Sequence, residues 1–133
     1  MRKNKFDLTK GEESMMEIFW DADNPLTIME VSRMTDEFND SYIHRLVKSL
    51  EKKEMLKVVG LQKSGKQYAR RFFPTMTREE YGAIVMGNLG IQGEKALAQV
   101  AVAMVKRIGN DTQKDKEMLI RELESIVEEL KRG

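Results

Sequence analysis

Apolar residues in the first half of the chain recur every three or four positions in three separate segments. This is the spacing of a helix with one buried side, and it predicts helices over about 10–21, over about 28–35 and from residue 39 or 40 onward. The apolar positions are Met15, Met16, Phe19 and Trp20, then Val31 and Met34, then Ile43, Leu46, Val47 and Leu50. The pattern favours three short helices around one core.

Start signals for three helices come from Thr-x-x-Glu pairs, in which each side chain accepts a hydrogen bond from a free amide at the helix start. The pairs are Thr9 with Glu12, Thr27 with Glu30, and Thr77 with Glu80. Asn39 and Asp40 are good caps for the remaining helix. Helical structure is therefore expected again after residue 77.

Between these helical segments the period of the pattern changes. Residues 56–62 and 66–73 form two runs rich in Val, Tyr and Phe, which are joined through Lys-Ser-Gly-Lys at 63–66. Gly65 can take the positive φ of a tight hairpin turn, and Pro74 is expected to stop the second strand. Three helices followed by a hairpin predict a mainly α fold with a small β-hairpin wing (α+β), a winged helix-turn-helix.

The rest of the chain is predicted to be helical, with a break at the glycines Gly87, Gly90 and Gly93. One apolar stripe is expected to end at Gly109, and a last helix covers 110–133. The exposed apolar stripes need a partner, and the candidate dimerisation residues are Leu97, Val100, Met104, Ile120, Leu123, Val127 and Leu130. We therefore expect a winged-helix domain over 6–76, whose proposed DNA binding rests on the third helix and the hairpin, and a helical dimerisation arm over 77–133.

Charge is distributed unevenly, although the net charge is only +1. Residues 6–41 hold ten acids against two bases, whereas residues 42–73 hold nine bases against two acids. The basic segment is the predicted third helix and hairpin. A local basic segment of this kind can bind a polyanion, although a charge run is often only a solvated surface.

The exposed side of the third helix predicts contacts with double-stranded DNA, because the start of this helix enters the major groove in helix-turn-helix proteins. The candidate base contacts are Ser41, Tyr42, His44, Arg45 and Ser49. The candidate phosphate contacts are Lys48, Lys52, Lys63, Ser64, Lys66 and Arg70. Two other interpretations of these charges remain. The side of the third helix could be only a solvated surface, and the charged hairpin could serve to protect its strand edge from other chains.

Enzyme and metal motifs are missing from the sequence. It has no phosphate-binding glycine loop, nucleophile elbow or His-Glu-x-x-His motif, and it has one histidine and no cysteine. We expect neither an enzyme nor a protein with a metal or cofactor. No run of eighteen apolar residues suggests membrane insertion, and a cytoplasmic location is expected.

Four segments resemble the penicillinase repressor family of bacterial transcription regulators. They are LTKGEESMMEIFWDAD at 8–23, LTIMEVSRM at 26–34, SYIHRLVKSLEKKEMLKVV at 41–59, and the aromatic strand from Tyr68 to Phe73 before Pro74. The resemblance covers residues 6 to about 80. Glu54 stands where the family has a glycine after the Lys-Lys pair.

The resemblance implies a homodimeric repressor, with interlocking C-terminal helices and two recognition helices on a palindromic operator. Some members are cleaved at an Asn-Phe bond, and copper-responsive members carry paired cysteines; this chain has neither. Two alternatives remain. One is a ligand-responsive regulator of the MarR type, with a pocket between the winged-helix domain and the helical arms. The other is a winged helix that binds an acidic protein instead of DNA.

Overall fold

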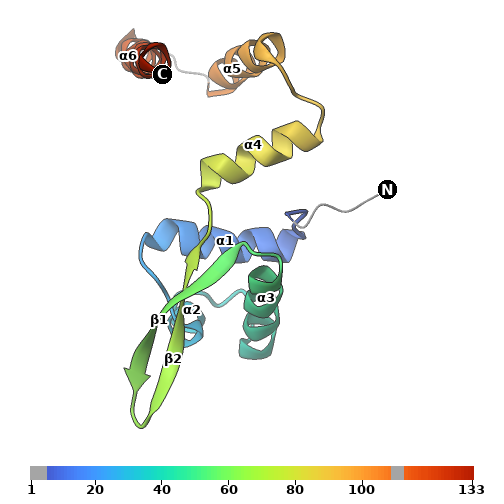
Figure 1. Cartoon of the computed structure of the whole chain (residues 1–133), viewed down its shortest axis with the longest axis vertical. Helices are drawn as coiled ribbons and strands as arrows, with labels where there is room; N and C mark the ends of the chain where they lie inside the picture. Colours follow the sequence, from blue (N-terminus) through green and yellow to red (C-terminus); the bar gives the residue numbers. More distant parts are fainter. Residues whose placement is uncertain (1–5, 109–112) are drawn as a thin grey trace. The chain divides into compact units, whose positions relative to one another are not determined.

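The chain divides into two compact units, Met1–Asn88 and Leu89–Gly133, which we call the head and the C-terminal unit. The computed structural model describes residues 6–108 and 113–133 (Figure 1). Most of the head is a winged helix-turn-helix, as the sequence predicts. The C-terminal unit is helical throughout its described elements.

Three helices open the head, close to their predicted positions: α1 (Lys10–Ala22), α2 (Ile28–Met34) and α3 (Asp40–Lys52). The predicted capping boxes are present at α1 and α2, where Thr9 pairs with Glu12 and Thr27 with Glu30. In each, the threonine hydroxyl accepts an amide hydrogen bond of 3.2 Å and the glutamate accepts one of 2.8 Å. These local contacts determine where α1 and α2 begin.

The hairpin consists of β1 (Leu56–Ser64) and β2 (Gln67–Pro74), paired antiparallel around Gly65, whose φ is +64°. Pro74 is the last residue of β2, one position beyond the predicted strand. This is possible because proline still offers a carbonyl and tolerates the end of an edge strand. Leu26 forms an isolated antiparallel bridge beside β2, since its backbone exchanges hydrogen bonds of 2.8 and 2.9 Å with Phe72.

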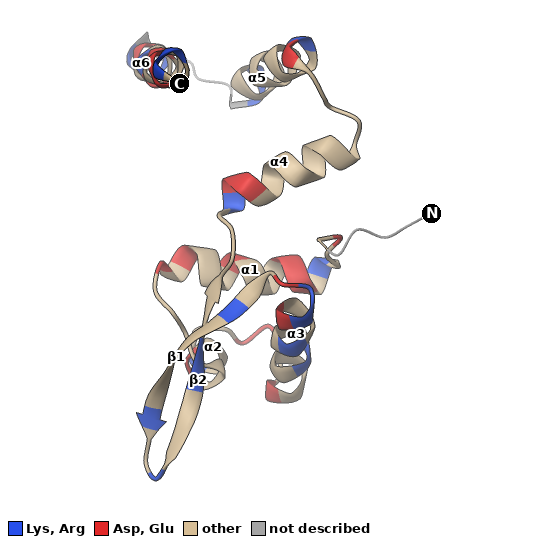
Figure 2. Cartoon of the chain, in the orientation of Figure 1, with Lys and Arg blue, Asp and Glu red and all other residues tan. Residues whose placement is uncertain are grey.

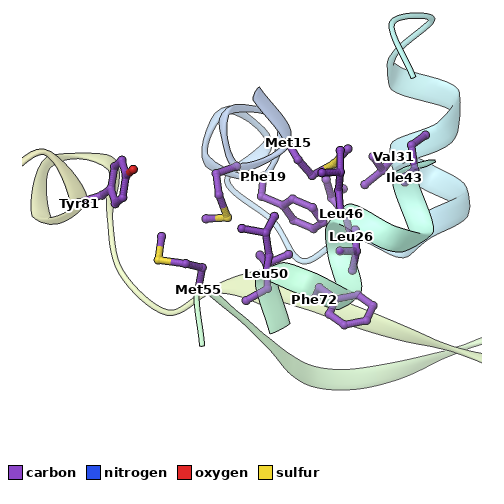
Figure 3. Packing of buried hydrophobic residues seen from close by; sticks show 13 residues of the cluster. Met15, Phe19, Leu26, Val31, Ile43, Leu46, Leu50, Met55, Phe72 and Tyr81 are labelled. Carbon is purple, nitrogen blue, oxygen red and sulfur yellow. The ribbon is translucent and has the colours of Figure 1, made fainter. Parts of the chain in front are cut away.

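The core of the head lies where α1, α3 and the hairpin meet; Figure 3 shows their side chains turned toward one another. Its buried apolar residues are Met15, Met16, Phe19, Leu26, Val31, Ile43, Leu46, Val47, Leu50, Met55, Leu56, Phe72 and Tyr81. The prediction was wrong for Met34, which is 53% exposed. Met34 is the last residue of a two-turn helix, and Ile28 packs against the core from that helix instead.

The end of α3 explains the position of Glu54. Its φ is +63°, the left-handed conformation in which glycine is usual after a helix. The Met55 amide donates to the Leu50 carbonyl at 2.9 Å, and the Glu54 amide donates to the Glu51 carbonyl at 3.0 Å. This pair of bonds is a Schellman cap. A glycine fits this position best, and the chain places a glutamate there.

Helix α4 (Arg78–Asn88) begins at the predicted Thr77–Glu80 capping box and packs against α1 within the head. Tyr81 is buried, and its hydroxyl donates to Glu13 Oε2 at 2.8 Å. The Trp20 ring lies 5.7 Å from the Tyr81 ring, and Trp20 Nε1 donates to the Met76 carbonyl at 3.0 Å. The first compact unit therefore extends to the end of α4, while the predicted functional division after residue 76 remains a prediction.

The C-terminal unit contains α5 (Glu94–Ile108) and α6 (Gln113–Arg132). Gly90 and Gly93, in the predicted break, have φ values of +85° and +86°. The predicted helix end at Gly109 and the start of the last helix at residue 110 lie outside the described residues. In the described part of the chain, no helix is both long enough and apolar enough to cross a lipid bilayer.

Candidate nucleic-acid interface

One side of α3 is buried and the other is a row of exposed hydrogen-bond donors. The buried side is formed by Ile43, Leu46, Val47 and Leu50. The exposed side carries Ser41, His44, Arg45, Lys48 and Lys52. Asn39 caps the helix by accepting from the Tyr42 amide at 2.8 Å. The core contacts therefore fix which residues of α3 face solvent.

Tyr42 lies between the exposed side of α3 and α1. Its ring packs edge-on against Phe38, with centroids 5.4 Å apart, and the Arg45 guanidinium lies 5.4 Å from the ring centroid. A β-carbon at Gly11 of α1 would lie 2.5 Å from the Tyr42 hydroxyl. Gly11 therefore gives Tyr42 the space to pack on α1, and Tyr42 in turn supports Arg45.

Ser49 also faces α1, where it meets the buried carboxylate of Glu12. The Ser49 hydroxyl donates to Glu12 Oε2 at 2.5 Å, and Lys53 Nζ donates to Glu12 Oε1 at 2.6 Å. Glu12 is only 3% exposed. Burial would raise the pKa of Glu12, but the hydrogen bonds from Lys53, Ser49 and the Thr9 amide outweigh it and lower that pKa. This contact ties the last turn of α3 to the first turn of α1.

The sequence did not reveal the roles of Glu12 and Lys53. Glu12 already had a function in the predicted capping box, and that box does account for one of its hydrogen bonds. The contact with Lys53 joins residues 41 positions apart. The available signal was that Ser49 and Lys53 are spaced one helical turn apart, so both can reach one partner.

The hairpin extends the basic surface beyond α3; Figure 2 shows Lys and Arg along α3 and at the hairpin turn. Lys63, Ser64 and Lys66 are exposed around the turn. Lys63 pairs with Tyr68 across the two strands, and Tyr68 is 66% exposed. Tyr68 was not among the predicted contacts. The register counted outward from Gly65 would have placed it beside Lys63.

A groove of about 410 Å³ separates α3 from β2. Its lining residues are Ile28, His44, Arg45, Val47, Lys48, Glu51 and Arg70. Four predicted contact residues, His44, Arg45, Lys48 and Arg70, therefore lie around one groove. The other predicted residues do not line it: Ser41 lies in the first turn of α3, Tyr42 and Ser49 contact α1, Lys52 lies further along α3, and the turn residues lie at the end of the hairpin.

The described residues give no sign of a metal centre. Within 6–108 and 113–133, no group of three or more His, Asp or Glu side chains is arranged to hold an ion. What the described interface does offer is hydrogen-bond donors and positive charge. Such a surface suits phosphates and the acceptor edges of bases.

Three helices, a basic hairpin and an exposed row of donors on the third helix define a winged helix-turn-helix fold. The chain belongs to the penicillinase repressor family, whose model matches residues 8–129, and is therefore a transcription regulator. This match confirms the resemblance seen in the sequence. A search of curated proteins found no match.

Comparison with solved structures found partial likenesses. A possible transcriptional regulator from Methanosarcina mazei Go1 is 20% identical over 79% of this chain and 80% of its own, with a TM-score of 0.49. The adhesin competence repressor AdcR from Streptococcus pyogenes is 16% identical over 97% and 85%, with a TM-score of 0.41. A cysteine-to-serine mutant of ZitR from Lactococcus lactis is 14% identical over 98% and 80%, also with 0.41. The sequence identities are low, and family membership rests on the sequence match to the family model.

Proposed function

We propose that this regulator binds double-stranded DNA and represses transcription from a palindromic operator as a homodimer. The observation that carries the proposal is the exposed side of α3, where Ser41, His44, Arg45, Lys48 and Lys52 face solvent beside a basic hairpin. A helix of this size fits the major groove. Helix α3 would lie in that groove, and the hairpin would follow the adjacent backbone.

The first turns of α3 are the part that would read bases. Ser41, His44 and Arg45 lie there and are exposed. Arg45 is the strongest candidate, because an arginine can donate two parallel hydrogen bonds to guanine. Tyr42 and Ser49 contact α1, so we assign them to the orientation of α3 and not to base contacts.

The remaining candidates would hold the backbone of the DNA. They are Lys48, Lys52, Lys63, Ser64, Lys66 and Arg70. Contacts of this kind position the protein without reading sequence. Because each neutralised phosphate releases bound cations, the lysines and Arg70 among these residues would make binding weaken steeply as salt increases, whereas Ser64 would only donate a hydrogen bond.

Two apolar helix sides in the C-terminal unit support the homodimer. Leu97 and Met104 on α5 are exposed, and Val100 is half-buried. On α6, Ile120, Leu123, Val127 and Leu130 are exposed. Apolar stripes of this length are normally covered in a soluble protein. A second copy would cover them and would present two copies of α3 to a site with twofold symmetry.

A salt series on random duplex DNA tests the proposed DNA binding. We expect fluorescence anisotropy to give a linear fall of log affinity against log salt, with a slope of about −0.9 for each phosphate contact. The same measurement with an acidic polypeptide such as polyglutamate separates DNA binding from a general affinity for anions. Absence of binding to duplex DNA even at low salt would contradict the proposal.

A further inference from the structure

The groove between α3 and β2 contains one carboxylate among basic groups. Of the described residues that line it, His44, Arg45, Lys48 and Arg70 are donors and Glu51 is the acid. A phosphate in this groove would meet three permanent cations and one anion. Glu51 is therefore the residue in this lining that opposes the proposed function.

Glu51 also holds a specific partner. Arg70 Nη1 lies 3.4 Å from both carboxylate oxygens of Glu51. The guanidinium carbon of Arg70 lies 5.1 Å from the centre of the Phe72 ring, which is buried in the core. The aromatic face and the carboxylate together hold Arg70 of the hairpin toward the last turns of α3.

The Arg70–Glu51 contact is weak enough to be exchanged. The Arg70 side chain is 56% exposed and that of Glu51 is 34% exposed. Exposed ion pairs of this kind contribute little to stability. A phosphate at the groove can therefore compete with Glu51 for the same guanidinium group.

We propose that Glu51 limits the affinity of this protein for DNA by pairing with Arg70, so that a phosphate must displace the carboxylate before it can bind this guanidinium group. The inference rests on the proposed DNA binding. Glu51 acts on DNA through Arg70 and is in this sense a positioning residue. A regulator of this design binds non-specific DNA less tightly than its basic charge allows, because one cation is already neutralised inside the interface.

A double-mutant cycle on the full chain tests this coupling. The wild-type chain, Glu51→Gln, Arg70→Gln and the double variant are each titrated onto random duplex DNA between about 50 and 200 mM salt. Over this range, phosphate contacts make the affinity for DNA fall steeply. We expect Glu51→Gln alone to tighten binding about twofold to fivefold and to steepen the salt slope by about 0.9. In the Arg70→Gln background, the same change should alter affinity less than about twofold, because the partner is gone.

Glu17→Gln is the matched control, since Glu17 is an exposed glutamate of α1 that does not line the groove. It should leave affinity and slope unchanged. Equal tightening by Glu51→Gln in both backgrounds would show that Glu51 acts by its own charge and would overturn the proposal, as would no tightening in either. A wild-type chain that binds no duplex at low salt would instead refute the proposed function, and this inference with it.

Discussion

In the head, apolar helix sides are covered and the buried carboxylate of Glu12 has three hydrogen-bond partners, whereas in the C-terminal unit apolar side chains are exposed along both helices. The head has its own core, built from α1, α2, α3 and the hairpin. Helix α6 has an apolar side like those of the helices in the head, but the side chains on it are exposed and not packed in a core. The contrast is the basis of the proposed homodimer: the head has a core within a single chain, and a second chain would cover the exposed apolar sides of the C-terminal unit.

The largest effect is expected from changing the apolar side of α6. Leu123→Asp combined with Val127→Asp should convert a dimer into a monomer, because burying each of these side chains contributes about 1.5–3 kcal/mol in each protomer. Self-association should weaken on the order of a thousandfold or more. Sedimentation velocity of the full chain measures this. Ser125→Asp, on the polar side of the same helix, is the control and should stay dimeric; a monomeric wild-type chain would refute the dimer.

A smaller effect is expected inside the head at Glu12. Glu12→Ala removes the partner of Ser49 and Lys53 and one half of a capping box. We expect the free energy of unfolding to fall by about 2–3 kcal/mol, somewhat below the value for a fully buried pair because Lys53 is 28% exposed.

Urea unfolding followed by fluorescence of Trp20, the single tryptophan, measures that loss in the head. Glu124→Ala on α6 is the matched change in the C-terminal unit; followed by circular dichroism, which reports the helices of both units, it should alter stability by less than about 0.5 kcal/mol. Equal losses from the two variants would contradict the special role of Glu12.

The pH dependence of stability should follow from the same carboxylate. Because the pKa of Glu12 is lower in the folded chain than in the unfolded chain, its contribution is complete above the ordinary value of 4.5. The contribution is lost as the pH falls through the lower folded pKa. The urea midpoint should therefore decrease on acidification below about pH 4.5. In Glu12→Gln this decrease should be smaller, and an unchanged pH profile would contradict the assignment.

The smallest effect is expected at the end of α3. Glu54→Gly should raise the free energy of unfolding by about 1 kcal/mol, because glycine adopts a φ of +63° without a clash from a β-carbon. Glu54→Ala keeps the β-carbon and loses the carboxylate, so it should not stabilise. Thermal unfolding of the three chains separates the backbone effect from the charge effect, and equal stabilisation by alanine would assign the effect to the charge.

Most elements of the head could be predicted from the sequence because their signals are local. Thr9 with Glu12 and Thr27 with Glu30 mark helix starts within four residues, and Gly65 marks the turn. Which residues of α3 are exposed could be predicted from the helical spacing of its apolar residues alone. The prediction that Met34 is buried was wrong because a two-turn helix can bury either of its ends. Here Ile28 packs against the core and Met34 is exposed.

The contacts that orient the interface could not be predicted because they join distant segments. Ser49 meets Glu12 across 37 positions, and its place in the sequence suggested a base contact. Arg70 meets Glu51 only because the hairpin folds back along α3. The packing of Tyr42 on α1 depends on the absence of a side chain at Gly11. A single glycine inside a helix gives no sequence pattern from which this contact could be predicted.

The most direct test of DNA reading by α3 is the affinity of Arg45→Ala for two duplexes, one selected from a random pool by the wild-type chain and one of unrelated sequence. We expect a loss of about 1–3 kcal/mol on the selected duplex and a much smaller loss on the other. Arg121→Ala on α6, which removes the same charge elsewhere, should bind both duplexes as the wild type does. An equal loss on the two duplexes, or no loss on either, would contradict the account.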